Sequence, residues 1–140
     1  MTIKQRVKIA CEKMNINLCE LAEKLEMRQS TLSVRLKTGK FTKEEIEKIA
    51  FNIGCLYNSY FLFPDGTKIK FSSIGIQIKN ALEYIGTTIT DLGNKMGITQ
   101  QAMSKRLKTG KFTQDELKNI ASMMGCKYVS EFVFEDGTKI

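Results

Sequence analysis

Histidine and tryptophan are absent from this 140-residue chain, and proline occurs once. Without histidine the chain lacks the commonest general base, so no Ser/His/Asp or Cys/His catalytic arrangement can be drawn. The four cysteines form no C-x-x-C pair and have no histidine with which to share a metal, which disfavours both a zinc site and disulfides. We therefore expect mostly buried, reduced thiols at Cys11, Cys19, Cys55 and Cys126, no metal, no cofactor and no enzymatic activity.

Long hydrophobic runs are also missing. No apolar stretch approaches the roughly 18 to 20 residues that a membrane-spanning helix needs. The first residues, MTIKQRVKIACEKMN, are charged and have helical periodicity, without the apolar core of a signal peptide. The sequence therefore predicts no membrane partner and a cytoplasmic location.

The charge is unbalanced, with 22 Lys and Arg against 15 Asp and Glu, a formal net charge of +7. An excess of this size is compatible with an anionic partner and also with solubility alone. The distribution of the charge favours a partner, because the basic residues gather in two acid-free stretches. One stretch, 28–43, contains five basic residues, and the other, 98–114, contains four.

An internal repeat explains why there are two such stretches. Residues 3–69 align without a gap with residues 74–140, and 30 of the 67 pairs are identical. A repeat of this length is too long for a solenoid unit and suits a minimal domain. The sequence therefore predicts two similar domains, 1–71 and 72–140, joined near residues 70–73.

Within each copy, apolar residues recur at helical spacing. We expect a first helix over about 3–14, opened by a capping box of Thr2 and Gln5, and a second over about 18–25 after the N-cap Asn17. A tight break, EMRQ or GITQ, leads to a third helix over about 29–37 or 100–108. Thr88 and Asp91 open the second helix of the second copy.

The heptapeptide LKTGKFT occurs in both copies, over 36–42 and 107–113. Gly39 and Gly110 suit the left-handed position just after a helix, where a side chain would cost about 1 kcal/mol. Thr42 then caps a fourth helix, with Glu45 reaching back to it. Thr113 and Glu116 occupy the same positions in the second copy. Much of the repeated heptapeptide thus has a backbone reason to stay constant.

After the fourth helix the pattern changes to period two. Four alternate residues of the first copy are identical to those of the second, while the residues between them vary, as expected for a strand with one buried face. These residues are Tyr57, Ser59, Phe61 and Phe63 in the first copy and Tyr128, Ser130, Phe132 and Phe134 in the second. A PDG or EDG turn followed by TKI completes a β-hairpin. The fold class is therefore mainly α with small β: two units of four helices, each followed by a C-terminal β-hairpin.

A short helix, a tight turn and a basic helix rich in Gln and Ser allow one helix to enter the DNA major groove while its partner braces it. The segment TITDLGNKMGITQQAMSKRLKTGK resembles the helix-turn-helix of lambdoid phage repressors and Cro proteins, the xenobiotic-response-element family. The segment LCELAEKLEMRQSTLSVRLKTGK of the first copy is similar. The resemblance implies two tandem helix-turn-helix domains. The family's usual turn glycine is Gly97 in the second copy and is replaced by Glu26 in the first.

The resemblance also implies which residues meet DNA. Gln100 and Gln101 match the positions that read base edges, and glutamine offers the donor and acceptor pair that fits adenine. Lys40 and Lys111 are expected at phosphates, where the dipole of the following helix helps. The predicted DNA-binding residues are Arg28, Gln29, Ser30, Ser33, Val34, Lys37 and Lys40 in the first copy and Thr99, Gln100, Gln101, Ser104, Lys105, Lys108 and Lys111 in the second.

Several of these basic and polar residues have plainer interpretations too. Arg35 and Arg106 face the protein on a helical wheel and are expected to bind an acid instead of DNA. The candidate acids are Glu20 and Glu45 for Arg35, and Asp91 and Glu116 for Arg106. Lys37 and Lys40 also suit the end of any helix, where a cation is favoured. The Gln and Ser side chains also suit an ordinary solvated surface.

We therefore expect a sequence-specific double-stranded DNA-binding protein, a repressor-like transcriptional regulator that uses two tandem recognition helices. The resemblance adds a bacterial or mobile-element source. Because Val34 and Lys105 differ at equivalent positions, the two helices are expected to read different sequences. The expected site is therefore asymmetric or like a direct repeat, unless whole chains form a homodimer through a hairpin edge. The alternative is a protein-interaction module of a regulatory complex in which one or both units no longer bind DNA.

Overall fold

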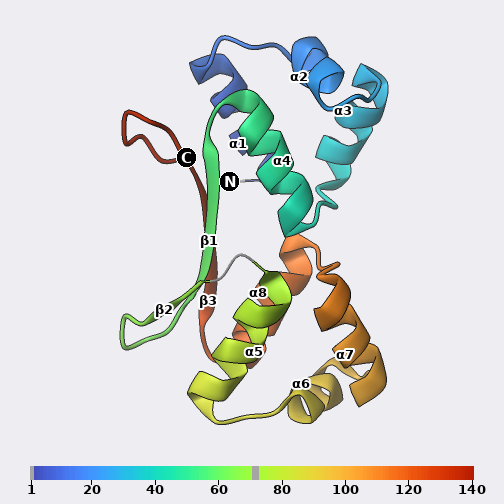
Figure 1. The fold of residues 1–140 in the computed structure, drawn as a ribbon, viewed down its shortest axis with the longest axis vertical. Helices are drawn as coiled ribbons and strands as arrows, with labels where there is room; N and C mark the ends of the chain where they lie inside the picture. The colour runs from blue at the N-terminus through green and yellow to red at the C-terminus, as the bar shows by residue number, and fades with distance from the viewer. Residues whose placement is uncertain (1, 71–72) are drawn as a thin grey trace. The chain divides into compact units, whose positions relative to one another are not determined.

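The computed structural model describes residues 2–70 and 73–140 (Figure 1). Within these ranges it contains eight helices and one three-stranded sheet, so the chain is mainly α with a small β component, as predicted. The expected joint near 70–73 lies partly outside the described residues, since Phe71 and Ser72 are not among them. None of the described helices has the length and apolar character needed to cross a membrane.

The helices of the two copies correspond one to one and lie close to the predicted ranges. The first copy forms α1 (Ile3–Lys13), α2 (Leu18–Lys24), α3 (Gln29–Thr38) and α4 (Lys43–Ile53). The second forms α5 (Ile74–Ile85), α6 (Ile89–Met96), α7 (Gln100–Thr109) and α8 (Gln114–Met123). The strands are β1 (Leu56–Leu62), β2 (Lys68–Ile69) and β3 (Lys127–Val133), in the sheet order β2-β1-β3.

The helix ends follow the signals in the sequence. Capping boxes open α1 at Thr2, α4 at Thr42 and α8 at Thr113, as expected from the residue three positions later. Gly39 and Gly110 both have φ of 68°, in the left-handed region, at the C-caps of α3 and α7. The heptapeptide is therefore constant largely because it ends one helix and begins the next.

Both expected hairpins are present, with one face buried. β1 pairs antiparallel with β2, and Phe61 lies opposite Ile69. The second hairpin closes through backbone hydrogen bonds between Phe132 and Ile140, 2.8 and 2.9 Å long. Phe61 and Phe132 are completely buried, which confirms the alternation that placed them in a core.

The compact units of the structure are divided differently from the two consecutive ranges that the repeat suggests. The first unit consists of residues 1–58 together with 130–140, and the second of residues 59–129. Each helical set is thus completed by the hairpin of the other copy. β1 and β3 each cross the boundary between the units, which falls after residue 58 in β1 and after residue 129 in β3.

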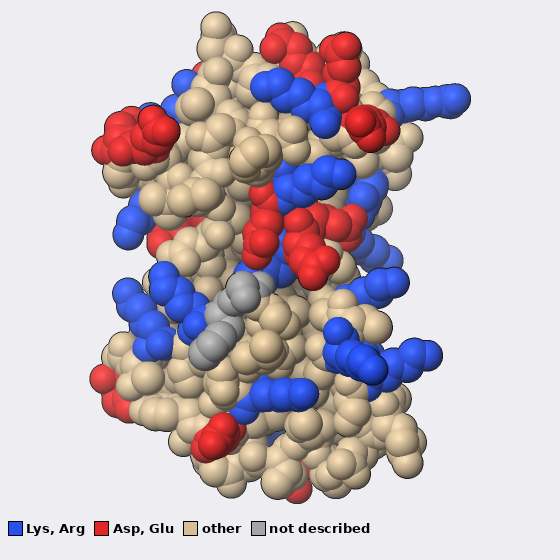
Figure 2. Space-filling model, in the orientation of Figure 1, with Lys and Arg blue, Asp and Glu red and all other residues tan. Residues whose placement is uncertain are grey.

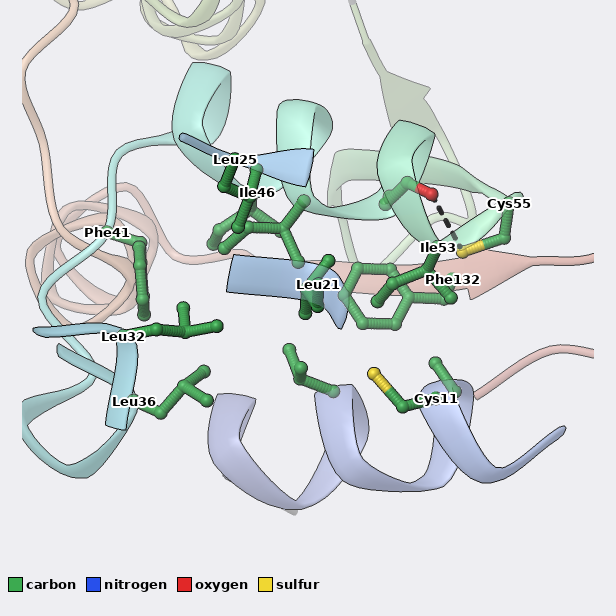
Figure 3. Close-up of a cluster of buried hydrophobic side chains, with 14 of the residues drawn as sticks. Cys11, Leu21, Leu25, Leu32, Leu36, Phe41, Ile46, Ile53, Cys55 and Phe132 are labelled. Carbon is green, nitrogen blue, oxygen red and sulfur yellow. Dashed lines mark hydrogen bonds between the residues drawn. The ribbon is translucent and has the colours of Figure 1, made fainter. Parts of the chain in front are cut away.

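In the first unit the hairpin residues of the second copy fill the core of α1–α4. Phe132 and Phe134 belong to the same buried cluster as Leu21 and Ile53. Figure 3 shows the ring of Phe132 between Ile53 and Leu21, facing α1. At the tip of the hairpin, Lys13 Nζ lies 2.8 Å from Asp136 Oδ2 and 5.3 Å from the centre of the Phe134 ring. The hairpin is therefore held by both apolar and charged contacts.

The second unit repeats this arrangement with different side chains at the tip. Phe61 and Phe63 lie in the buried cluster of α5–α8. Tyr84, which replaces Lys13, packs its ring 4.7 Å from that of Phe63 and donates its hydroxyl hydrogen to Asp65. The aspartate of each hairpin turn is thus bound by a residue near the end of the first helix of the other copy.

Candidate nucleic-acid interface

Each unit contains two short helices packed against each other across a tight turn, α2 with α3 and α6 with α7. The turn closes by backbone hydrogen bonds, 3.0 Å from Met27 to Ala22 and 2.9 Å from Ile98 to Gly93. α3 also contacts α1, and α7 contacts α5, so that each second helix is braced on two sides. These contacts fix the inward face of α3 and α7 and leave the opposite face to solvent.

The turn is more strained in the first unit than in the second. Glu26 has φ of 57° and Gly97 has φ of 72°, so both residues adopt the left-handed conformation that the turn requires. Glycine does so at little cost, whereas a residue with a side chain pays about 1 to 2 kcal/mol. The first copy therefore keeps the turn despite having lost the glycine, and it places a carboxylate there.

The outward face of α7 carries the residues that the sequence predicted for it. Met103 and Leu107 are 0% and 3% exposed and pack into the core, as expected. α7 lies so close to α5 that a Cβ on Gly75 would be 2.0 Å from the backbone oxygen of Leu107. The side chains left exposed include Gln100, Gln101, Ser104, Lys105 and Lys108. A rigidly seated helix thus presents a polar and basic surface.

α3 has the same arrangement with one apolar substitution. Leu32 and Leu36 are buried, whereas Val34 is 62% exposed at the position of Lys105. The other outward residues are all exposed: Gln29, Ser30, Ser33 and Lys37. The two outward faces therefore share a Gln, a Ser and a Lys but differ chemically at their centres.

The residues just before α3 and α7 differ in whether their side chains cap the helix. Thr99 is exposed, and its hydroxyl oxygen accepts a hydrogen bond of 3.1 Å from the Ala102 backbone N–H, which makes it the N-cap of α7. Its hydroxyl hydrogen remains available as a donor. Arg28 is the N-cap of α3, is also exposed, and makes no side-chain capping bond. Both residues lie at the start of their helix, next to the glutamines.

Arg35 and Arg106 are half-buried, and each binds an acid. Arg35 pairs with Glu45, and Arg106 pairs with Glu116. Each guanidinium also donates to a backbone oxygen in the glycine loop, that of Lys40 at 3.4 Å or that of Lys111 at 3.2 Å. Each stacks over a phenylalanine of the heptapeptide at 4.7 or 4.6 Å from the ring centre. The pairing expected with the acid of the fourth helix is therefore confirmed.

These pairs affect the ionisation of the two glutamates. Partial burial would raise the pKa of Glu116, but the hydrogen bonds from Arg106 and Thr113 outweigh it, so the pKa lies below its ordinary value. The pKa of Glu45 is lowered in the same way by bonds from Thr42 and Arg35. Both acids are thus ionised near neutral pH and neutralise their arginines, which leaves the exposed Lys40 and Lys111 as the cations of the loop.

The two units differ in net charge. The first has twelve basic and ten acidic side chains, whereas the second has ten basic and five acidic ones. Figure 2 shows basic side chains along the edge of the second unit where α7 lies. The second unit therefore has the larger net positive charge, about +5, and part of that charge lies on the surface that includes α7.

The thiols and acids of the described part of the chain do not form a metal site. No group of three metal-binding side chains is found there. Cys11, Cys55 and Cys126 are buried and Cys19 is exposed. Burial raises the pKa of Cys55 and of Cys126 to about 11, so both thiols are protonated near neutral pH.

One feature of the surface was not singled out from the sequence. On the outward face of the sheet, Lys68 Nζ and Lys70 Nζ lie 4.9 and 5.9 Å from the centre of the Tyr60 ring. The only signal in the sequence is a pair of lysines at alternate positions after the turn, which by itself is common.

Neither the scan against protein-family models nor the searches of curated proteins and of solved structures gave a match.

Proposed function

We propose that the chain is a sequence-specific double-stranded DNA-binding protein that inserts α7, and α3 with it, into the major groove. The observation that carries this proposal is the outward face of α7, where two adjacent glutamines, a serine and two lysines are exposed on a helix locked against its neighbours. Similarity to the lambdoid repressor and Cro family in the sequence points the same way. A regulator of transcription is the function that such an interface serves.

The interface divides into reading and holding residues. Gln100 and Gln101, at the start of α7, have the paired donor and acceptor that fit adenine. Lys105 and Lys108 lie farther along the same helix and suit guanine or phosphate. Lys111 is exposed beside the N-terminus of α8, where backbone N–H groups favour a phosphate. In this proposal the variable residues read sequence, and the lysine of the repeated heptapeptide holds the backbone.

The two units are expected to read different bases. The exposed Val34 suits contact with a thymine methyl group, whereas its counterpart Lys105 suits guanine or phosphate. A chain with two unlike reading helices selects an asymmetric site or a direct repeat. A strictly two-fold symmetric footprint under a single chain would contradict this part of the proposal.

The assignment of roles is tested by substitution on the reading face. Gln100→Ala with Gln101→Ala is expected to weaken binding to the preferred site by about 1 to 3 kcal/mol per good bidentate contact, while non-specific binding survives. Lys118→Ala is the control, because Lys118 is an exposed lysine of α8 outside the proposed interface. Equal loss on preferred and scrambled duplexes would contradict the reading role.

A second candidate is a protein-interaction module, and one observation favours it for the first unit. Phe51 and Leu56 are 77% and 70% exposed, whereas their counterparts in the second copy are Ser122 and Lys127. Exposed large apolar side chains often mark a protein contact. The test is to substitute Val34→Ala and Gln29→Ala on α3. If DNA binding depends on α7 and these two substitutions do not change it, the first unit is a protein-interaction module.

A further inference from the structure

A second basic surface lies on the outward face of the sheet in the second unit. We name it the lysine face and define it by Tyr60, Lys68, Lys70 and Lys127. The alternation of β1 places Tyr60 on the face opposite the buried Phe61, and the three lysines are exposed. The outward residues of the sheet that belong to the second unit also include Leu62 and Val129, and none of them is acidic; Glu131, on the same face of β3, belongs to the first unit.

The lysines of this face are held close together. The pairing of Phe61 with Ile69 and of Leu62 with Lys68 brings β2 alongside Tyr60. Both Lys68 and Lys70 then lie within 6 Å of the Tyr60 ring centre, in the range of cation–π attraction. Two like charges drawn to one ring repel each other, and an anion between them would remove that repulsion.

The first unit shows what the same face looks like when it is neutralised. Glu131 occupies the position of Tyr60, and its carboxylate lies 3.8 Å from Lys139 Nζ, the counterpart of Lys68. The same carboxylate accepts a hydrogen bond of 3.2 Å from the Asn58 amide. The duplication has thus produced one face with an internal ion pair and one with an aromatic ring and an excess of positive charge.

We propose that the lysine face binds the phosphate backbone of a second segment of DNA. Lys68 begins β2 and Lys70 directly follows it, and alternate residues of an extended chain are about 6.6 Å apart, close to the axial rise over two phosphates of one DNA strand. α5 contacts both β2 and α7, and the lysine face is formed by other elements than the outward face of α7. Figure 2 shows basic side chains on the side of the second unit that carries β2.

This inference rests on the proposed function, because it takes DNA as the ligand and α7 as the reader of the first duplex. It makes the chain able to hold two duplexes at once, one read by α7 and one held without regard to sequence. The salt dependence of the second contact follows from the number of phosphates that it neutralises.

A capture experiment with the full chain tests the inference. The chain is bound to an immobilised duplex, and capture of a second, fluorescent duplex of unrelated sequence is measured. Lys68→Gln with Lys70→Gln is expected to reduce capture about tenfold, and to lower the salt exponent of capture by about 2. Tyr60→Glu, which installs the acid found at the equivalent position of the first unit, is expected to do the same, and Lys139→Gln is the matched control without effect. Unchanged capture in the first two variants would overturn the proposal, as would displacement of the second duplex by polyglutamate more readily than by unlabelled DNA.

A parallel titration with one non-specific duplex at low salt separates this inference from the proposed function. Lys108→Gln with Lys111→Gln removes charge at α7, and Lys68→Gln with Lys70→Gln removes it from the lysine face. If only the first pair weakens binding, the lysine face is not a DNA contact. If only the second pair does, the lysine face stands and the role of α7 fails.

Discussion

At the scale of single residues, the two copies show what a duplicated unit tolerates. The tight turn before α3 or α7 needs a left-handed residue, which glycine supplies at Gly97 and glutamate at Glu26. The same exchange occurs after the first helix, between Gly86 and Asn15. Gly97 was expected as the turn glycine and Glu26 as its replacement, whereas the positive φ of Asn15 and of Gly86 was not predicted from the sequence.

Glu26→Gly is therefore expected to stabilise the first unit. Relief of the left-handed strain contributes about 1 to 2 kcal/mol, and the greater freedom of glycine in the unfolded chain offsets part of it, leaving about 0.5 to 1 kcal/mol. Urea denaturation measures the change as a higher midpoint at unchanged slope. Gly97→Ala is the counterpart and should lower the midpoint; a lower midpoint for Glu26→Gly would contradict the strain.

A buried polar pair gives a second prediction. In the first unit Arg6 donates to the backbone oxygen and the hydroxyl of Ser130 at 2.9 and 2.8 Å. The equivalent Gln77 and Ser59 are both buried, and among the described residues their side-chain polar atoms have no hydrogen-bond partner. Gln77→Met is expected to raise the free energy of unfolding by about 1 to 2 kcal/mol, because it removes polar atoms that burial leaves unsatisfied.

Arg6→Met is the control for that change. It removes a satisfied donor and leaves the Ser130 hydroxyl buried, so it is expected to lower the free energy of unfolding by about 1 to 2 kcal/mol. Thermal unfolding of the two variants should therefore shift in opposite directions. Two destabilised variants would indicate that Gln77 makes a favourable contact in solution.

At the scale of elements, an ion pair links α3 to α4 in the first unit and α7 to α8 in the second. Arg106 joins α7 to Glu116 of α8 and to the loop oxygen of Lys111. The side-chain exposures of Arg106 and Glu116 are 32% and 35%, so the pair contributes only about 0.5 to 1 kcal/mol. Its main effect is to set the position of the glycine loop and its exposed lysine.

The ion pair predicts how stability depends on pH. Because the pKa of Glu116 is lower in the folded state than its ordinary value, its contribution is present above that value and is lost as the pH falls through the folded pKa. Arg106→Gln should therefore be less stable than the wild type near neutral pH and converge with it in acid. Urea midpoints between pH 3 and pH 7 measure this, and a constant difference across the range would contradict it.

At the scale of the whole molecule, the exchange of hairpins was not predictable from the sequence. The inward residues of the two hairpins are identical, among them Phe61 and Phe132, and so are the exposed turn residues Asp65 and Asp136. Each set of helices offers a similar apolar surface to either hairpin, so the sequence pattern specifies that a hairpin binds but not which one. The helices, caps and outward faces were predictable, because they depend on contacts close in the sequence.

The exchange is tested by removing one ring at a time. Phe132→Ala leaves a cavity in the core of α1–α4 and is expected to cost about 3 to 5 kcal/mol. Hydrogen exchange should then accelerate in α1–α4 more than in α5–α8, although residue 132 belongs to the second copy. Phe61→Ala is the matched variant and should accelerate exchange in α5–α8 first. The opposite pattern in both variants would mean that each hairpin folds onto its own helices.

The central proposal is that the exposed faces of α7 and α3 read double-stranded DNA. The most direct measurement is to select bound fragments from random duplexes and then compare affinities for the selected and a scrambled duplex over a range of salt. We expect the selected duplex to bind at least about 10³-fold more tightly, with log affinity falling against log salt at a slope of about −5 to −7 if six to eight phosphates are neutralised. Equal affinity for the two duplexes, or no binding at low salt, would contradict the proposal.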